Sequence, residues 1–175
     1  QKLYNERFPD VVFLRNEKNL GTPIGNNVGI RYALEHNADY VMMLNNDTIV
    51  GKDFLSPLVE AMENDTSIGI AGGKIYYHSE PTRIWFDGGN FNRRTTRAVH
   101  LGMMEYDNAR KPTREENNFI SGCYALLRAS SLRITGLLDE NFFAYMEDTD
   151  LCLRIQQAGF KMKYLPQSKI WHKVS

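Results

Sequence analysis

The chain has 175 residues, which is enough for one domain with a substantial core. It carries 21 basic and 21 acidic residues, so its formal net charge of zero gives no support for binding nucleic acid through overall charge. No apolar run approaches the roughly 18 residues of a membrane-spanning helix. The two cysteines, Cys123 and Cys152, lie in apolar patterns, which favours reduced, buried thiols over a disulfide framework.

The first predicted elements are a strand and a helix. The apolar run Val-Val-Phe-Leu at residues 11–14 predicts a short buried strand. A helix is predicted from Thr22 to about Asn37, with Thr22 as N-cap residue and Pro23 at the first helical position, where a missing N–H costs nothing.

Small residues form one flat stripe along this predicted helix. Gly25, Gly29 and Ala33 recur every four residues and therefore share a face. Each glycine inside a helix costs ~1 kcal/mol relative to alanine. The stripe therefore indicates close approach of another group, and a neighbouring strand and a bound ligand are equally good candidates.

The most informative stretch follows this helix. Residues 40–44 are apolar and predict a buried strand, which stops abruptly at Asn45, Asn46 and Asp47. Ligands of open α/β sheets bind beyond the carboxyl ends of strands, and Mg²⁺ and Mn²⁺ prefer oxygen ligands. Asp47 is thus a candidate cation ligand, although asparagine and aspartate also favour ordinary turns.

The middle of the chain changes character along its length. A helix at 53–64 and a strand at 68–71 continue the alternation of strands and helices, which favours a parallel α/β sheet. Residues 74–104 contain short strand-like pieces and predict an antiparallel or irregular insertion. The charged segment 106–118 predicts a mobile loop.

The last third returns to regular patterns. Residues 119–127 form the longest strand-like run, and a helix is predicted at 147–159 with Gly159 as its C-terminal cap. Asp150 and Arg154 are spaced to pair on that helix. Two final strands are predicted at 162–165 and 169–171.

Two further residues have the chemistry of a catalytic site. Asp148 begins the predicted helix after the aromatic stretch 142–146, and partial desolvation there would raise its proton affinity, which suits a general base. The ordinary alternative is an acid that stabilises the positive end of the helix dipole. His172 ends the last strand, and we expect it to lie close to Asp47 because both residues end strands at the same edge of the sheet.

The ordered set of motifs resembles the inverting family 2 glycosyltransferases, and its rhamnosyltransferase-like branch is the nearest match. The resemblance covers essentially the whole chain. The matching segments are residues 19–30 (Asn-Leu-Gly-Thr-Pro-Ile-Gly-Asn-Asn-Val-Gly-Ile), 44–48 (Leu-Asn-Asn-Asp-Thr), 121–123 (Ser-Gly-Cys), 139–143 (Asp-Glu-Asn-Phe-Phe), 147–154 (Glu-Asp-Thr-Asp-Leu-Cys-Leu-Arg) and 171–172 (Trp-His).

The resemblance implies a GT-A fold, which is an α/β fold with a mixed, mainly parallel sheet flanked by helices. Residues 45–47 match the Asp-x-Asp motif of the family, so Asp47 would bind a divalent cation, Mn²⁺ or Mg²⁺, on the donor diphosphate. Asn45 replaces the first acid of that motif, and its amide oxygen would still bind the cation but brings less charge to the site. His172 would complete the cation site, and Asp148 would be the general base for the acceptor hydroxyl.

The resemblance also implies binding partners and their contacts. The donor would be a nucleoside-diphosphate sugar, and the acceptor a saccharide or a lipid-linked intermediate of cell-surface polysaccharide synthesis, which places the protein in the cytoplasm or at the inner face of the plasma membrane. The residues expected on the nucleotide side are Asn19, Gly21, Gly25, Asn26, Gly29, Asn45 and Asn46. The residues expected to contact the acceptor are Trp85, Gly122, Tyr145 and Glu147.

One departure concerns the start of the chain. Family members begin with a strand and a helix that hold the nucleotide base, and residues 1–175 contain no equivalent. We therefore expect a single, partial catalytic domain that by itself is a weak catalyst. The absent unit would leave a free sheet edge through which two copies could associate.

Two alternatives belong to other functional classes. A fragment or degenerate relative of this fold could bind a glycan or a partner without catalysis. A sugar nucleotidyltransferase would also bind a nucleotide sugar, but it requires a glycine-rich signature with lysine or arginine that this sequence lacks.

Overall fold

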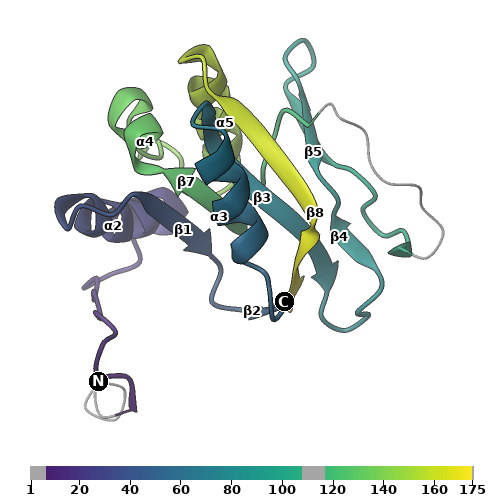
Figure 1. Ribbon diagram of the computed structural model, residues 1–175, viewed down its shortest axis with the longest axis horizontal. Coiled ribbons are helices and arrows are strands. Elements are labelled where there is room, and N and C mark those ends of the chain that lie inside the picture. Colours follow the sequence, from purple (N-terminus) through teal and green to yellow (C-terminus); the bar gives the residue numbers. More distant parts are fainter. Residues whose placement is uncertain (1–6, 108–116, 175) are drawn as a thin grey trace.

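The chain forms one mixed sheet flanked by helices, with a small second sheet at its side (Figure 1). This computed structural model describes residues 7–107 and 117–174. The helices are α2 (Gly21–Glu35), α3 (Ser56–Asn64), α4 (Ala129–Thr135) and α5 (Glu147–Gln157). The strands are β1 (Tyr40–Leu44), β2 (Thr48–Val50), β3 (Ile68–Tyr77), β4 (Ile84–Phe86), β5 (Gly89–Asn92), β6 (Arg97–His100), β7 (Tyr124–Arg128) and β8 (Lys161–His172).

The main sheet has six strands and is mixed, as predicted, but its neighbouring strands are mainly antiparallel and not mainly parallel. Its order is β1-β7-β3-β8-β2, and β4 pairs with the C-terminal end of β3. Strands β1, β3 and β8 run in one direction, but only β3 and β8 are adjacent parallel neighbours, because antiparallel β7 lies between β1 and β3. The carboxyl ends of β1 and β8 therefore face the same edge of the sheet.

Two strand predictions needed correction. The last two predicted strands are a single strand, β8, whose pairing with β3 shifts between Leu165 and Lys169. Pro166 lies in this irregular part and has no N–H to donate to the ladder. The predicted strand at 119–127 is shorter, since only residues from Tyr124 onward pair as β7, and residues 121–123 form a turn before it.

The core lies between the sheet and helices on both of its faces. Helix α3 covers the face turned toward the viewer in Figure 1, where Leu58 and Met62 are fully buried. Gly69 of β3 lies against Ile155 of α5, and a Cβ atom there would approach the Ile155 side chain to 2.9 Å. A larger residue at this position would therefore separate the sheet from α5.

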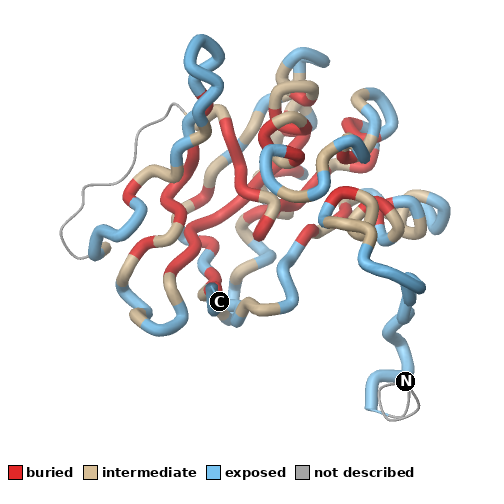
Figure 2. Tube along the Cα trace, turned by 180° about the vertical axis from the view of Figure 1, so that it is seen from behind, coloured by how far each residue is buried: buried red, intermediate tan, exposed pale blue. Residues whose placement is uncertain are grey.

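The apolar segment 11–14 is not a strand. Its four side chains are between 40% and 58% exposed, and no strand of the described residues pairs with it. A strand requires a neighbour that satisfies its backbone groups, and none lies beside this segment, which extends away from the body of the domain (Figure 2). Its exposed apolar side chains remain available for packing.

Helix α2 begins earlier than predicted. Its first residue is Gly21, and Thr22 makes no capping hydrogen bond. Instead, the Asn19 side chain accepts a hydrogen bond from the Gly21 N–H at 2.9 Å. Gly21 has φ +77°, and an added Cβ would lie 2.5 Å from the Phe143 carbonyl oxygen, so both conformation and space require glycine.

The predicted glycine stripe on α2 has no close neighbour among the described residues. A Cβ atom at Gly25 or Gly29 would meet nothing within 4 Å. The strand-packing explanation of the stripe is therefore wrong within this part of the chain, and its role toward a ligand stays a prediction.

The buried amide of Asn27 ties α2 to the loop that follows α4. Asn27 donates to the carbonyl oxygen of Leu138 at 2.8 Å and accepts from the Leu138 N–H at 3.1 Å. It also donates to Glu140 at 3.0 Å. This loop leads to residues 142–146 beside the pocket, so Asn27 indirectly positions them.

We expect Asn27→Ala to lower the free energy of unfolding by about 2–6 kcal/mol, because the two buried backbone groups of Leu138 lose their partners at about 1–3 kcal/mol each. Urea denaturation followed by circular dichroism measures the loss. Asn26→Ala is the matched control, since among the described residues the Asn26 side chain donates one hydrogen bond, to the Thr22 carbonyl oxygen of the same helix. Equal stabilities of the two variants would contradict this account of the anchor.

Other predictions agree with the structure. Both cysteines are free and buried, Asp150 pairs with Arg154 at 2.7 Å, and Gly159 follows α5 with φ +87°.

The predicted loop 106–118 lies mostly outside the described residues. Among the helices described, none has the length and apolar character needed to cross a membrane.

Candidate active site

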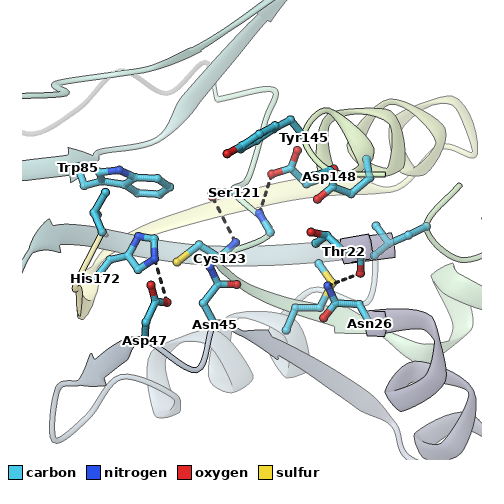
Figure 3. Close-up of a pocket in the computed structure, with 16 residues that line it drawn as sticks. Thr22, Asn26, Asn45, Asp47, Trp85, Ser121, Cys123, Tyr145, Asp148 and His172 are labelled. Atoms are coloured by element: carbon cyan, nitrogen blue, oxygen red, sulfur yellow. Dashed lines mark hydrogen bonds and ion pairs between the residues drawn. The ribbon is translucent and has the colours of Figure 1, made fainter. Parts of the chain in front are cut away.

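A pocket of about 390 Å³ opens at the carboxyl edge of β1 and β8 (Figure 3). It collects residues from distant parts of the sequence, which lie on β1, β4, β8, α2, α5 and the turn before β7. The predicted site residues that line it are Asn26, Asn45, Asp47, Trp85, Gly122, Tyr145, Glu147, Asp148 and His172.

Asp47 and His172 are adjacent, as predicted. His172 Nε2 lies 3.0 Å from Asp47 Oδ1. The backbone explains this position, because Thr48 pairs directly with His172 and the Lys173 N–H donates to the Asp47 carbonyl oxygen at 2.9 Å. The His172 side chain is largely buried, and its Nδ1 has no hydrogen-bond partner among the described residues.

Asn45 lies on the same side of the pocket as this pair. Its N–H donates to the Cys123 carbonyl oxygen at 3.0 Å, which continues the pairing of β1 with β7 by one residue. Its side chain is therefore held beside Asp47 and Cys123 (Figure 3). Asn46 is exposed in the turn and does not line the pocket.

Asp148 is held by two backbone N–H groups. Its Oδ2 accepts from Gly122 at 2.9 Å, and its Oδ1 accepts from Thr149 at 2.7 Å. An added Cβ at Gly122 would lie 3.1 Å from the Asp148 Cβ, so glycine lets the turn approach the carboxylate closely. A carboxylate offers about four lone-pair sites, which leaves capacity for a hydroxyl group from a ligand.

The predicted aromatic enclosure of Asp148 is not formed. Phe143 is 66% exposed and Tyr145 is 85% exposed, so these side chains are largely solvated and do not enclose the carboxylate in apolar surroundings. Tyr145 and Met146 both have positive φ, 68° and 72°, a conformation that is costly for such side chains. This turn redirects the chain into α5 and brings Tyr145 to the rim of the pocket.

Burial acts on two other groups near Asp148. Glu147 is largely buried, and desolvation raises the pKa of its carboxyl group above the usual value, with a smaller effect from the Asp148 charge. Burial also raises the pKa of the Cys123 thiol to about 12, assisted by the charges of Asp47 and Asp148. Cys123 is therefore a neutral thiol near neutral pH.

The residues expected on the nucleotide side are only partly brought together. Asn26 and Asn45 line the pocket, whereas Gly21 does not and lies close to Phe143. Asn19, Gly25 and Gly29 do not line it either. Their assignment to the nucleotide stays a prediction.

Sequence reasoning missed several lining residues. They are Thr22, Met43, Ser121, Cys123, Leu138, Ala144 and Val174. The Ser-Gly-Cys motif at 121–123 was the available signal, since it interrupts an apolar run directly before β7. The others reach the pocket only through tertiary packing, and no local pattern marks them.

The site and fold agree with sequence comparison. Residues 40–175 match the profile of Glycosyl transferase family group 2. The chain belongs to this family.

Two curated relatives are rhamnosyltransferases by name. The chain is 23% identical over 158 residues to the dTDP-rhamnosyl transferase RfbF of Shigella flexneri, which covers 90% of this chain and 50% of the relative. It is 36% identical over 62 residues to the N-acetylglucosaminyl-diphospho-decaprenol L-rhamnosyltransferase of Mycobacterium tuberculosis, which covers 35% of this chain and 20% of the relative. The chain thus spans at most about half of either relative.

A solved structure supports the predicted fold. GalNAc-T7, crystallised with UDP, GalNAc and Mn²⁺, superposes with a TM-score of 0.67 at 16% identity over 91% of this chain and 31% of that one. At this identity the likeness concerns the fold alone, and the fold is the GT-A type that the sequence predicted.

Proposed function

We propose that the protein transfers a sugar from a nucleoside-diphosphate sugar to a hydroxyl acceptor with inversion, and that residues 1–175 form one partial catalytic domain. The observation that carries this proposal is a single pocket that contains both the Asp47–His172 pair and the hydrogen-bonded carboxylate of Asp148. One group suits the donor diphosphate and the other suits an acceptor hydroxyl, so one pocket can accommodate both reactants.

Asp148 is the proposed general base. Its carboxylate takes the proton of the acceptor hydroxyl as that oxygen bonds to the anomeric carbon of the donor. The bond between the anomeric carbon and the diphosphate breaks on the opposite face, and its electron pair leaves with the diphosphate. The N–H groups of Gly122 and Thr149 hold both carboxylate oxygens, so the base is oriented before the acceptor arrives.

The residues around Asp47 fit a divalent cation. Two neighbouring ligands of an octahedral cation with bonds of about 2.1 Å lie about 3.0 Å apart, and Asp47 Oδ1 and His172 Nε2 have a separation of 3.0 Å. Asp47, His172 and the Asn45 amide would hold the ion, and the two oxygen donors among them, the carboxylate and the amide oxygen, suit Mn²⁺ or Mg²⁺. The cation would supply charge that stabilises the departing diphosphate.

The protein supplies few ligands of its own for such an ion. Within residues 7–107 and 117–174, no group of three or more histidine, cysteine or acidic side chains could hold a metal. Magnesium sites of this kind complete their coordination with substrate phosphates and water. We therefore propose that cation and donor bind together, with Asn45 lowering the affinity for the cation alone.

The names of the relatives suggest which substrates to test first. A dTDP-activated rhamnose is the leading donor, because both reported relatives are named rhamnosyltransferases. A lipid-linked or saccharide acceptor follows from the second name, and it would bring the protein to the membrane periphery. Other nucleotide sugars remain part of the test.

The direct experiment incubates the complete protein with dTDP-, UDP- and GDP-sugars, Mn²⁺ and a panel of glycoside acceptors. We expect release of a nucleoside diphosphate together with a glycoside of inverted anomeric configuration, measured by mass spectrometry and NMR. Glycan binding without turnover would favour the non-catalytic alternative. A product that contains a newly formed nucleotide–sugar bond would favour a nucleotidyltransferase and overturn this proposal.

A further inference from the structure

Trp85 provides the largest flat apolar surface inside the pocket. It is half-buried on β4, and its indole lies across the pocket from Asp148 (Figure 3). One face of a pyranose ring carries mainly C–H groups, and such a face packs well against an aromatic ring, which offers a large apolar contact area. Trp85 is therefore suited to hold a sugar ring while a hydroxyl of that sugar points toward Asp148.

Two imidazoles contact this indole edge to face. The ring centroids of Trp85 and His172 are 5.0 Å apart with an interplanar angle of 83°. Those of Trp85 and His100 are 4.6 Å apart with an angle of 71°. His172 belongs to the pair with Asp47, whereas His100 lies on β6 and belongs to no such pair among the described residues.

His100 lies behind the platform and does not line the pocket. It ends β6, the second strand of the β5–β6 hairpin, which pairs with no strand of the main sheet. Its ring also contacts Phe86 edge to face, with 5.0 Å between ring centroids, and stacks on Phe119, with 5.8 Å between ring centroids. The imidazole thus packs the β5–β6 hairpin against Trp85, Phe86 and Phe119.

The imidazole of His100 is largely shielded from solvent, unlike that of a surface histidine. Its buried Nδ1 has no partner among the described residues, and the ring interacts with the backbone of Trp85. Burial lowers the pKa of His100, although the Trp85 backbone and the charge of Asp148 act in the opposite direction. A neutral imidazole packs on three aromatic neighbours without bringing a charge into the apolar cluster.

We propose that His100 is a positioning residue for acceptor binding: it holds Trp85 as the platform on which an acceptor pyranose stacks. This inference rests on the transferase function proposed above and adds to it the acceptor class, a hexopyranoside. Because the ring contacts of His100 are with Trp85, Phe86 and Phe119, and His100 does not line the pocket, we expect its contribution to concern the acceptor and not the donor.

The test is His100→Leu in the complete protein, with hexopyranoside acceptors varied at saturating donor. An aromatic contact and a hydrogen bond each change an equilibrium constant about two- to tenfold. We expect the KM for the acceptor to rise about tenfold, kcat at saturating acceptor to change less than about threefold, and the calorimetric Kd for nucleoside diphosphate with Mn²⁺ to stay within about twofold. His100→Gln, which restores a side-chain N–H, is expected to recover part of the loss.

The matched control is His36→Leu, the same substitution at an exposed histidine on the far end of α2. It should leave all three constants unchanged. A purely structural role of His100 would lower the melting temperature and weaken donor and acceptor binding together, without recovery in His100→Gln. That pattern, or an unchanged acceptor KM in His100→Leu, would overturn the proposal.

A second measurement needs no turnover. The chain contains two tryptophans, so Trp171→Phe leaves Trp85 as its only indole. We expect methyl hexopyranosides to change the emission of Trp85, an acyclic polyol such as sorbitol to change it far less, and His100→Leu to remove the response. If no donor supports transfer, the proposed function fails, but the emission response of Trp85 still tests the role of His100. The inference is overturned if the sugars do not change the emission of the Trp171→Phe protein. It is also overturned if they change the emission equally after His100→Leu is added to that protein.

Discussion

Replacing Asp148 by asparagine is expected to lower the rate of sugar transfer by about 10²- to 10⁴-fold, which is the usual contribution of general acid–base catalysis. The amide cannot accept the acceptor proton, whereas the donor site around Asp47 keeps all its groups. The measurement compares kcat of variant and parent, with the Kd for donor nucleotide determined separately by calorimetry. We expect that Kd to change little.

The same substitution also perturbs the turn at Gly122, and the design must separate the two effects. Asparagine has one oxygen for two N–H groups, those of Gly122 and Thr149, so one backbone donor loses its partner. Asp150→Asn is the matched control, because Asp150 lies on the same helix but pairs with Arg154. If Asp148→Asn kept most of its turnover, Asp148 would not be the base, and Glu147 would be the next carboxyl group to test.

Asp47→Asn is expected to weaken donor binding in the presence of Mn²⁺ by about 100-fold, since a cation contributes several kcal/mol to a diphosphate site and each 1.4 kcal/mol is a factor of ten. Asparagine retains the turn preference of the segment and removes only the charge. Calorimetric titration of the nucleoside diphosphate with and without Mn²⁺ gives the effect. Without the cation, parent and variant should bind within about threefold of each other.

Two further variants complete this experiment. His172→Ala should reproduce the loss of the Mn²⁺ effect, because the imidazole faces Asp47 at 3.0 Å. Asp53→Asn removes an exposed acid shortly after β2 and should bind like the parent. Full retention of Mn²⁺-dependent binding in both Asp47→Asn and His172→Ala would remove these residues from the cation site.

Much of this site could be predicted from residue patterns. An apolar strand that ends in Asn45, Asn46 and Asp47, and a last strand that ends in His172, predicted correctly that the acid and the histidine would meet. The reason is local: strand pattern and chain direction assign each residue to an end of a strand, and strands that run in the same direction end at the same edge. Helix α5 and the place of Asp148 at its start followed in the same way from apolar periodicity and capping.

Other features of the molecule could not be predicted in this way, because they arise from tertiary packing. The insertion of β7 between β1 and β3, the exposure of residues 11–14, the open space at Gly25 and Gly29, and the contact of His100 with Trp85 leave no mark in local sequence. Each depends on which distant segment becomes a neighbour, and that choice is made by the packing of whole elements. Residue patterns report the propensity of a segment and the face it buries, but they do not name the partner against which that face is buried.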